Sequence, residues 1–267
     1  MKVFRYIVSI LLIAAAVGLL CYRYFADGQL TSNDIMKAGI IILGAIASAF
    51  KTNRNVVSNK KALYKKAYEE FISDVFYDEP KLEKKFYSAV HDYNQKKPAA
   101  AVAKLEKLRE ECQRTSDIYS VTVFTALSLD DMGLWEKAIT QYEAAARIRN
   151  NSTLHSNKAL CLQRLGKYEE AETSYRQAIA CDPKNAYAYN NLASLYFHEE
   201  DYESALELAE EAITHNPQLH QALTTAAMSC ALLGFTEQYE KYYRQAVNHG
   251  ADGNAIKRKI KSLDPAL

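Results

Sequence analysis

The chain has 267 residues, and its 33 Lys and Arg nearly balance its 32 Asp and Glu, so the formal net charge is +1. A near-neutral chain lacks the basic excess that nucleic-acid binding favours, and we expect no nucleic-acid partner. The five cysteines are odd in number and widely spaced, with no Cys-x-x-Cys motif. This pattern argues against a disulfide framework and fits a reducing cytosol.

The first fifty residues contain two apolar runs separated by a polar turn. The run from Tyr6 to Tyr22 is uncharged, and its helix would span roughly 26 Å, near the lower limit for a bilayer. The run from Ile35 to Phe50 is interrupted only by Lys37, close to its start. We therefore predict that residues 1–50 form two transmembrane helices, arranged as an antiparallel hairpin.

The flanking charges predict how this hairpin is oriented. Residues 1–66 hold ten basic and two acidic side chains, whereas the remainder holds 23 basic and 30 acidic. Both termini should therefore be cytoplasmic, in a multi-pass protein of a cell membrane, and the basic N-terminus with its short apolar run indicates a bacterial inner membrane. The alternative is a cleaved signal peptide, but no small-x-small cleavage site follows the first run.

Residues 51–81 are expected to form a basic juxtamembrane segment and a helix that ends at Pro80. Residues 82–118 read as two further helices, separated near Pro98. No Gly- or Ser-rich linker interrupts this part of the chain, so we expect it to lead directly into the segment that follows.

The next segment, residues 119–250, repeats itself every 33 or 34 residues. Self-similarity at this period predicts helix–turn–helix units that stack into a solenoid. Small residues let paired helices approach closely, aromatic residues fill the remaining space, and Gly permits the left-handed backbone that ends a helix. The residues that recur in register are Ala126, Ala159, Ala193 and Ala227; Gly133 and Gly166; Ala138, Ala171 and Ala205; Tyr142 and Tyr175; and Ala145, Ala178, Ala212 and Ala246.

This pattern resembles the tetratricopeptide repeat (TPR), and one copy reads Tyr189, Leu192, Ala193, Tyr196, Tyr202, Ala205, Ala209, Ala212, Pro217. The last copy departs from the pattern, because Tyr239 stands where Ala is expected. The fold class implied is an all-α, right-handed α-solenoid of TPR-like helix pairs preceded by a two-helix transmembrane hairpin. Residues 119–250 would be TPR repeats, residues 82–118 a degenerate TPR-like repeat, and residues 251–267 a C-terminal capping helix.

In this family the first helix of each repeat lines a concave groove, so the resemblance also implies partner-binding residues. A Lys/Asn/Arg clamp for C-terminal carboxylates is not expected, because Tyr187 and Asn191 stand where that clamp needs Lys and Arg. The partner-binding residues predicted from the register are Asn157, Gln163, Arg164, Tyr187, Asn190, Asn191, Phe197 and His198.

The sequence contains no catalytic motif, phosphate loop or histidine pair with metal-ligand spacing. We therefore expect that the protein is not an enzyme and that it binds no metal and no cofactor. The prediction is a membrane-anchored TPR scaffold that binds a protein or peptide in its concave groove and recruits it to the membrane. The alternatives are a self-associating homo-oligomer that acts as a structural or assembly factor of a membrane complex, and a non-catalytic subunit of an enzyme.

Overall fold

The computed structural model describes residues 61–72, 75–76 and 78–265. The chain divides into two compact units, Met1–Ile72 and Ser73–Leu267. The predicted transmembrane hairpin, residues 1–50, lies outside the described residues. Of the first unit, residues 61–72 are described, and residues 61–67 are helical. Among the helices of the described ranges, none combines the length and the apolar composition needed to cross a membrane.

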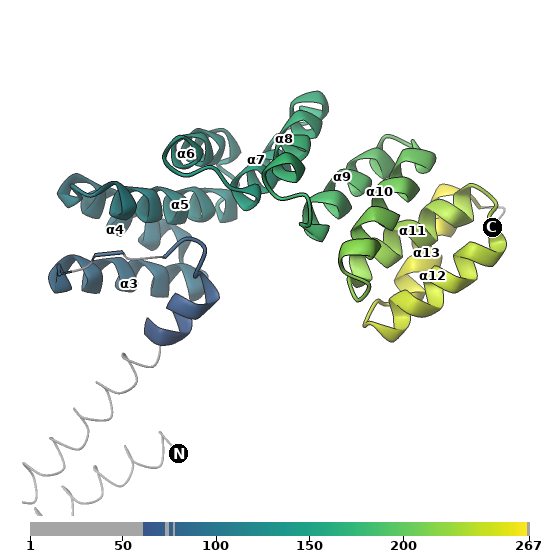
Figure 1. The fold of residues 1–267 in the computed structure, drawn as a ribbon, viewed down its shortest axis with the longest axis horizontal. Coiled ribbons are helices and arrows are strands. Elements are labelled where there is room, and N and C mark those ends of the chain that lie inside the picture. Colours follow the sequence, from purple (N-terminus) through teal and green to yellow (C-terminus); the bar gives the residue numbers. More distant parts are fainter. Residues whose placement is uncertain (1–60, 73–74, 77, 266–267) are drawn as a thin grey trace, which may run out of the picture. The chain divides into compact units, whose positions relative to one another are not determined.

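The second unit consists of helices, and its described residues contain no strand. Figure 1 shows these helices following one another in chain order along the unit. Their bounds are α3 (Pro80–Asn94), α4 (Pro98–Glu111), α5 (Thr115–Asp131), α6 (Trp135–Ile148), α7 (Ser152–Arg164), α8 (Tyr168–Cys181), α9 (Ala186–His198), α10 (Tyr202–His215), α11 (His220–Leu232), α12 (Thr236–Asn248) and α13 (Gly253–Leu263).

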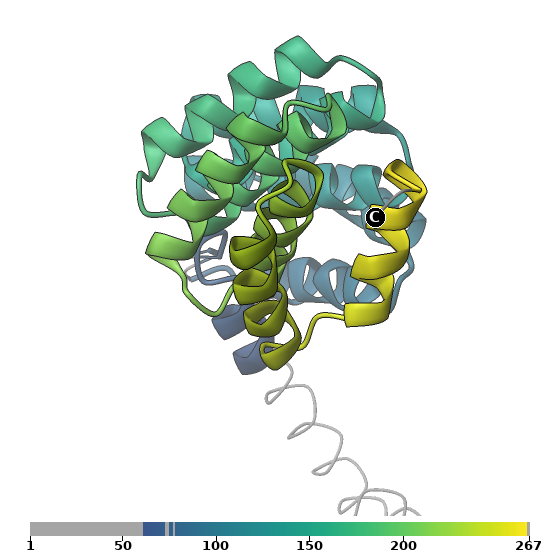
Figure 2. The same cartoon turned by 90° about the vertical axis from the view of Figure 1, so that its right-hand side faces the viewer.

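The helices pack as pairs, and each pair packs against the next. The pairs are α3–α4, α5–α6, α7–α8, α9–α10 and α11–α12, and α13 packs against α11 and α12. Figure 2 looks at this unit from its C-terminal side, where α12 and α13 are close to the viewer. The all-α solenoid expected from the repeat is confirmed.

The alanines of the repeat form the contacts within and between pairs. Ala126, Ala159, Ala193 and Ala227 are all 0 % exposed, so no atom of these side chains reaches solvent. Tyr142 and Tyr175, which recur one repeat apart, are also buried. The alternation of methyl groups and aromatic rings therefore produces the close packing that the sequence pattern predicted.

Helix ends are set by local side chains and by backbone conformation. Asn151, Asn185, Asp201 and Asp252 each accept a hydrogen bond from a backbone N–H in the first turn of the helix that they precede. Such caps satisfy donors that would otherwise be unpaired. Gly166 ends the first helix of its pair with φ +74°, in the left-handed region that favours glycine.

Candidate functional site

The first helices of successive pairs form the inner side of the solenoid. Helix α7 contacts α9, α9 contacts α11, and α11 contacts α13. In a curved stack, equivalent elements come closest on the concave side, so these contacts identify the first helices as the lining of the groove. The candidate site is therefore sought on α7, α9, α11 and α13.

An open cavity of about 490 Å³ lies among α9, α11 and α13. Its wall combines mostly polar side chains on α9 and α11 with small, apolar and charged residues on α13 and on the loop that precedes it. We call this cavity the C-terminal groove. It is lined by Asn190, Ser194, His220, Gln221, Thr224, Thr225, Met228, Gly250, Ala251, Asp252, Ala255, Ile256 and Lys259.

Asn190 contributes the most informative atom of the C-terminal groove. Its side chain is 8 % exposed, and its Oδ1 has no hydrogen-bond partner in the described part of the chain. A buried acceptor without a donor costs about 1–3 kcal/mol. Thr225, a buried polar residue on α11 of the next pair, is satisfied because its hydroxyl donates to the Gln221 carbonyl at 3.2 Å. Asn190 Oδ1 is thus an unpaired acceptor beside the C-terminal groove, and rotation of the side chain would present it to an N–H donor from a ligand.

The other predicted residues of α9 differ in their exposure to solvent. Tyr187 is 58 % exposed and lies about one turn before Asn190 on the same helix face. Asn191, which follows Asn190 directly, is half-buried. Phe197 is buried, and its ring packs against Tyr202 with centroids 5.3 Å apart. His198 is exposed at the last position of α9. The Phe197 ring is therefore covered by its own chain.

The predicted residues of α7 are engaged with neighbouring side chains. Gln163 Oε1 accepts a hydrogen bond from the Tyr175 hydroxyl at 3.2 Å. Arg164 donates to Asp130 on α5, although burial still raises the pKa of that carboxyl. Asn157 is half-buried beside the buried hydroxyl of Tyr142. Gln163 and Arg164 are therefore already engaged by side chains of the same chain.

Helix α13 supplies lining residues that the sequence reasoning did not propose. Ala255, Ile256 and Lys259 face the C-terminal groove, whereas the sequence predicts residues 251–267 only as a capping helix. The available signal was the amphipathic pattern of this helix, which places Ile256 and Ile260 against the preceding pair. A helix that packs on the end of the stack must also border the groove that ends there. Within the described ranges, no group of three or more His, Cys, Asp or Glu is placed to hold a metal ion.

Residues 156–220 match the family model of the tetratricopeptide repeat. The DnaJ homolog subfamily C member 3 homolog of Dictyostelium discoideum is 27 % identical over 158 residues, which are 56 % of this chain and 31 % of that protein. Stress-induced-phosphoprotein 1 of Caenorhabditis elegans is 28 % identical over 107 residues, 38 % of this chain and 33 % of that protein. The matched segments thus span about a third of the length of these curated relatives.

Solved structures with the same fold include a double mutant of MamA RS-1, with a TM-score of 0.55 and 15 % identity over 68 % of this chain and 97 % of that one. YrrB, described as a TPR protein with an unusual peptide-binding site, has a TM-score of 0.51 and 16 % identity over 66 % of this chain and 90 % of that one. Residues 156–220 therefore carry the sequence pattern of the tetratricopeptide repeat, and the helices of the second unit have the fold of these solved structures.

Proposed function

We propose that this protein is a TPR scaffold that holds an extended segment of a partner protein in the C-terminal groove. The observation that carries this proposal is the buried, unpaired Oδ1 of Asn190. An extended peptide exposes backbone N–H groups along its length, so one of them can satisfy this acceptor. Protein and peptide binding is also the role that the names of several similar proteins indicate, among them YrrB and the Hsp70-Hsp90 organizing protein 3 of Arabidopsis thaliana.

The composition of the groove wall indicates which ligand segment would fit. Met228 and Ile256 offer apolar surface, and Ser194, Gln221 and Thr224 offer hydrogen-bonding groups. A segment with small or apolar side chains would place them against the first two residues and hydrogen-bond through its main chain to the others. Asn157, Tyr187, Asn191 and His198 extend the proposed binding surface along α7 and α9, whereas Gln163, Arg164 and Phe197 are engaged by their own chain.

Residues 1–50 form the proposed membrane anchor, with the repeats on the cytoplasmic side. The support for this part is the sequence: two apolar runs and a basic excess on both flanks. Anchoring a groove at a membrane raises the local concentration of its partner there. If residues 1–50 span the membrane, the full chain stays in the pellet after alkaline extraction of membranes. A chain released by that treatment would contradict the anchor and leave the groove proposal standing.

A photo-crosslinking amino acid placed in the full chain tests the groove directly. Ser194 is exposed and lines the C-terminal groove, whereas Thr214 is exposed on α10, the second helix of the same pair. We expect discrete partner adducts from position 194 and none of the same mass from position 214. The adducts should disappear in Asn190→Leu and persist in Asn248→Leu, the same change at an exposed position of α12. Equal adducts from both positions would contradict groove binding.

A further inference from the structure

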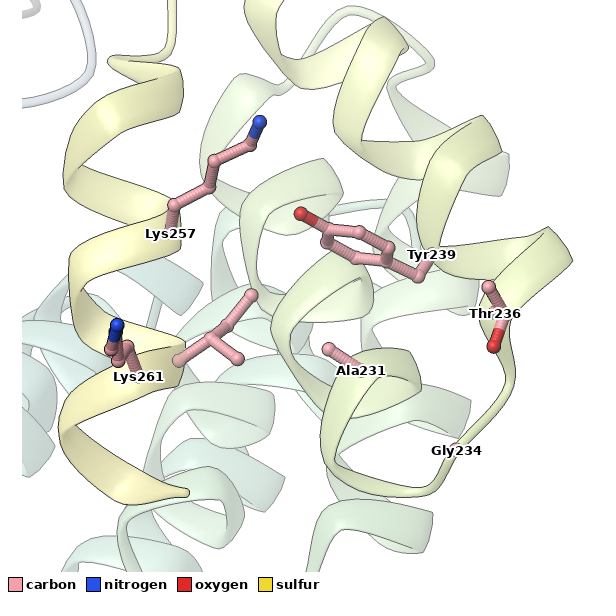
Figure 3. Close-up of a pocket in the computed structure, with 7 residues that line it drawn as sticks. Ala231, Gly234, Thr236, Tyr239, Lys257 and Lys261 are labelled. Atoms are coloured by element: carbon pink, nitrogen blue, oxygen red, sulfur yellow. The ribbon is translucent and has the colours of Figure 1, made fainter. Parts of the chain in front are cut away.

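A second cavity, of about 410 Å³, lies where α13 meets the α11–α12 pair. We call it the terminal pocket. Figure 3 shows its two sides: α13 carries Lys257 and Lys261, and α11, α12 and the turn between them carry the other labelled residues. Ile260, on α13, is buried and contributes an apolar wall. The terminal pocket is lined by Ala231, Gly234, Thr236, Tyr239, Lys257, Ile260 and Lys261.

The terminal pocket lies beside Tyr239, the residue at which the last repeat departs from the alanine pattern. Ala138, Ala171 and Ala205 occupy this position in the earlier pairs, and each is fully buried. Tyr239 replaces them, and a phenol ring cannot occupy the space of a methyl group. Its side chain instead reaches toward α13 (Figure 3), remains partly exposed, and packs against Tyr243 with ring centroids 5.6 Å apart.

The α13 side of the terminal pocket is strongly basic. Between Gly253 and Leu263 the helix carries four cationic side chains and no Asp or Glu. In the part of the chain that the structure describes, Arg258 pairs with Asp252 at 3.7 Å, and Lys257 lies over the Tyr243 ring at 5.1 Å. Lys261, one turn beyond Lys257, has no carboxylate within ion-pair distance among the described side chains. An anionic group with an apolar stem, such as a glutamate side chain, matches this combination of lysines and apolar wall.

The same chain carries a surface with that chemistry. Residues 199–211 hold seven Asp and Glu and no Lys or Arg. Three of them, Glu203, Glu207 and Glu211, follow one another at intervals of four residues on α10, and all three are exposed. Four residues is also the interval between Lys257 and Lys261, and it corresponds to about one helical turn, or roughly 6 Å along the axis. None of these three glutamates forms an ion pair with the described residues of its own chain.

We propose that the terminal pocket of one chain docks on the Glu203–Glu207–Glu211 stripe of α10 in a second copy. Charge complementarity carries the proposal: the lysine pair and the glutamate stripe have opposite charge and equal spacing, and none of their side chains forms an ion pair within the described residues. Because pocket and stripe are different surfaces, the contact is heterologous, and copies add head to tail into a ring or a filament. Exposed ion pairs are screened by salt, so this association should weaken as ionic strength rises.

Charge reversal in the full chain, purified in detergent or in lipid nanodiscs, tests the proposal. We expect sedimentation velocity to show concentration-dependent oligomers of the wild type at low salt and their loss at high salt. Lys257→Glu with Lys261→Glu should weaken self-association at least about tenfold, and so should Glu203→Lys with Glu207→Lys. Lys107→Glu with Lys137→Glu, at exposed positions on α4 and α6, is the matched control, and it should associate like the wild type.

The decisive step is recombination of the charges. The two reversed proteins should associate with each other when mixed, and a chain carrying all four reversals should recover self-association. A monomeric wild type, oligomers that the reversals leave intact, or reversed proteins that do not associate when mixed would each overturn the proposal. So would a monomeric chain whose lysine pair binds anionic vesicles or a poly-glutamate peptide, since the pocket would then serve another anion. Crosslinking from Ser194 tests binding in the C-terminal groove and not self-association, so either proposal can fail while the other stands.

Discussion

Glu200 occupies a backbone position that three other repeats give to glycine. Its φ is +64°, and Gly133, Gly166 and Gly234 have φ of +72°, +74° and +78° in the equivalent turns. An L-residue in this left-handed region costs about 1–2 kcal/mol. Glycine removes that strain but loses about 0.5–1 kcal/mol through the greater freedom of the unfolded chain. Glu200→Gly should therefore stabilise the repeat unit by about 0.5–1 kcal/mol.

The control substitutions separate backbone strain from side-chain charge. Glu200 is exposed, and Glu200→Gln removes its charge while keeping the left-handed strain, so we expect almost no change in stability. Gly166→Ala should lose about 1 kcal/mol, and it tests φ alone because a Cβ added at Gly166 meets no atom within 4 Å. Lys96, at φ +57° in the α3–α4 turn, offers a second site for the same gain.

Thermal unfolding followed by circular dichroism measures the sum of these effects, and the expected rise in Tm for Glu200→Gly is about 1–4 °C. Solenoids open locally, so hydrogen exchange of the amides in α9 and α10 should slow more than that in α5 and α6. Glu200→Gly being no more stable than Glu200→Gln would refute the strain argument. A gain spread evenly over all repeats would refute its local origin.

Three further predictions concern the groove, the thiols and acid stability. Asn190→Leu should abolish the Ser194 crosslink and raise the free energy of unfolding by about 1 kcal/mol, because it removes an unpaired buried acceptor; a destabilised variant would mean that Asn190 is structural. Burial raises the pKa of Cys161 to about 12, so a maleimide at pH 7.5 should label exposed Cys181 quickly and Cys161 only in denaturant; equal labelling rates in the native protein would contradict this packing. Hydrogen bonds from Tyr196 and Arg176 lower the pKa of Glu172 in the folded protein. The stability that these bonds add is therefore fully present above the pKa that Glu172 has in the unfolded chain, and it is lost as pH falls through its lower pKa in the folded protein. Urea unfolding of Glu172→Gln should accordingly show a loss of ~0.5 kcal/mol at pH 7 that vanishes well below pH 4, and a loss that persists there would have another cause.

The fold was predictable because the small residues that recur in the sequence are the ones that pack between the helices. Ala159 and Ala193 are spaced by one structural unit, and only a stacked array buries them at every copy. Proline residues indicated where the first two helices of the second unit begin, since α3 begins at Pro80 and α4 begins at Pro98. The left-handed backbone at Glu200 could be inferred only from its register with Gly166 and Gly234, because a glutamate by itself does not indicate that conformation.

The site was predictable only as far as the register extends. Asn190 lines the C-terminal groove, and the spacing of the repeats is what singled out its position; its role in binding stays a prediction. The engagement of Arg164 by Asp130 was missed, because these residues are 34 positions apart and a charge count does not pair them. The contribution of Ile256 was missed for a different reason: α13 has no counterpart in the repeat from which a register could be read.

Helix α13 takes part in both proposed sites, which gives them a physical connection. Ile256 and Lys259 face the C-terminal groove, and Lys257 and Lys261 face the terminal pocket. The helix is held to the stack chiefly through two buried side chains, Ile256 and Ile260. A ligand or a second copy that binds only when α13 is docked stabilises that docked state by its own binding free energy. Occupation of one site therefore favours the α13 position on which the other site depends, and by linkage the effect must be equal in both directions.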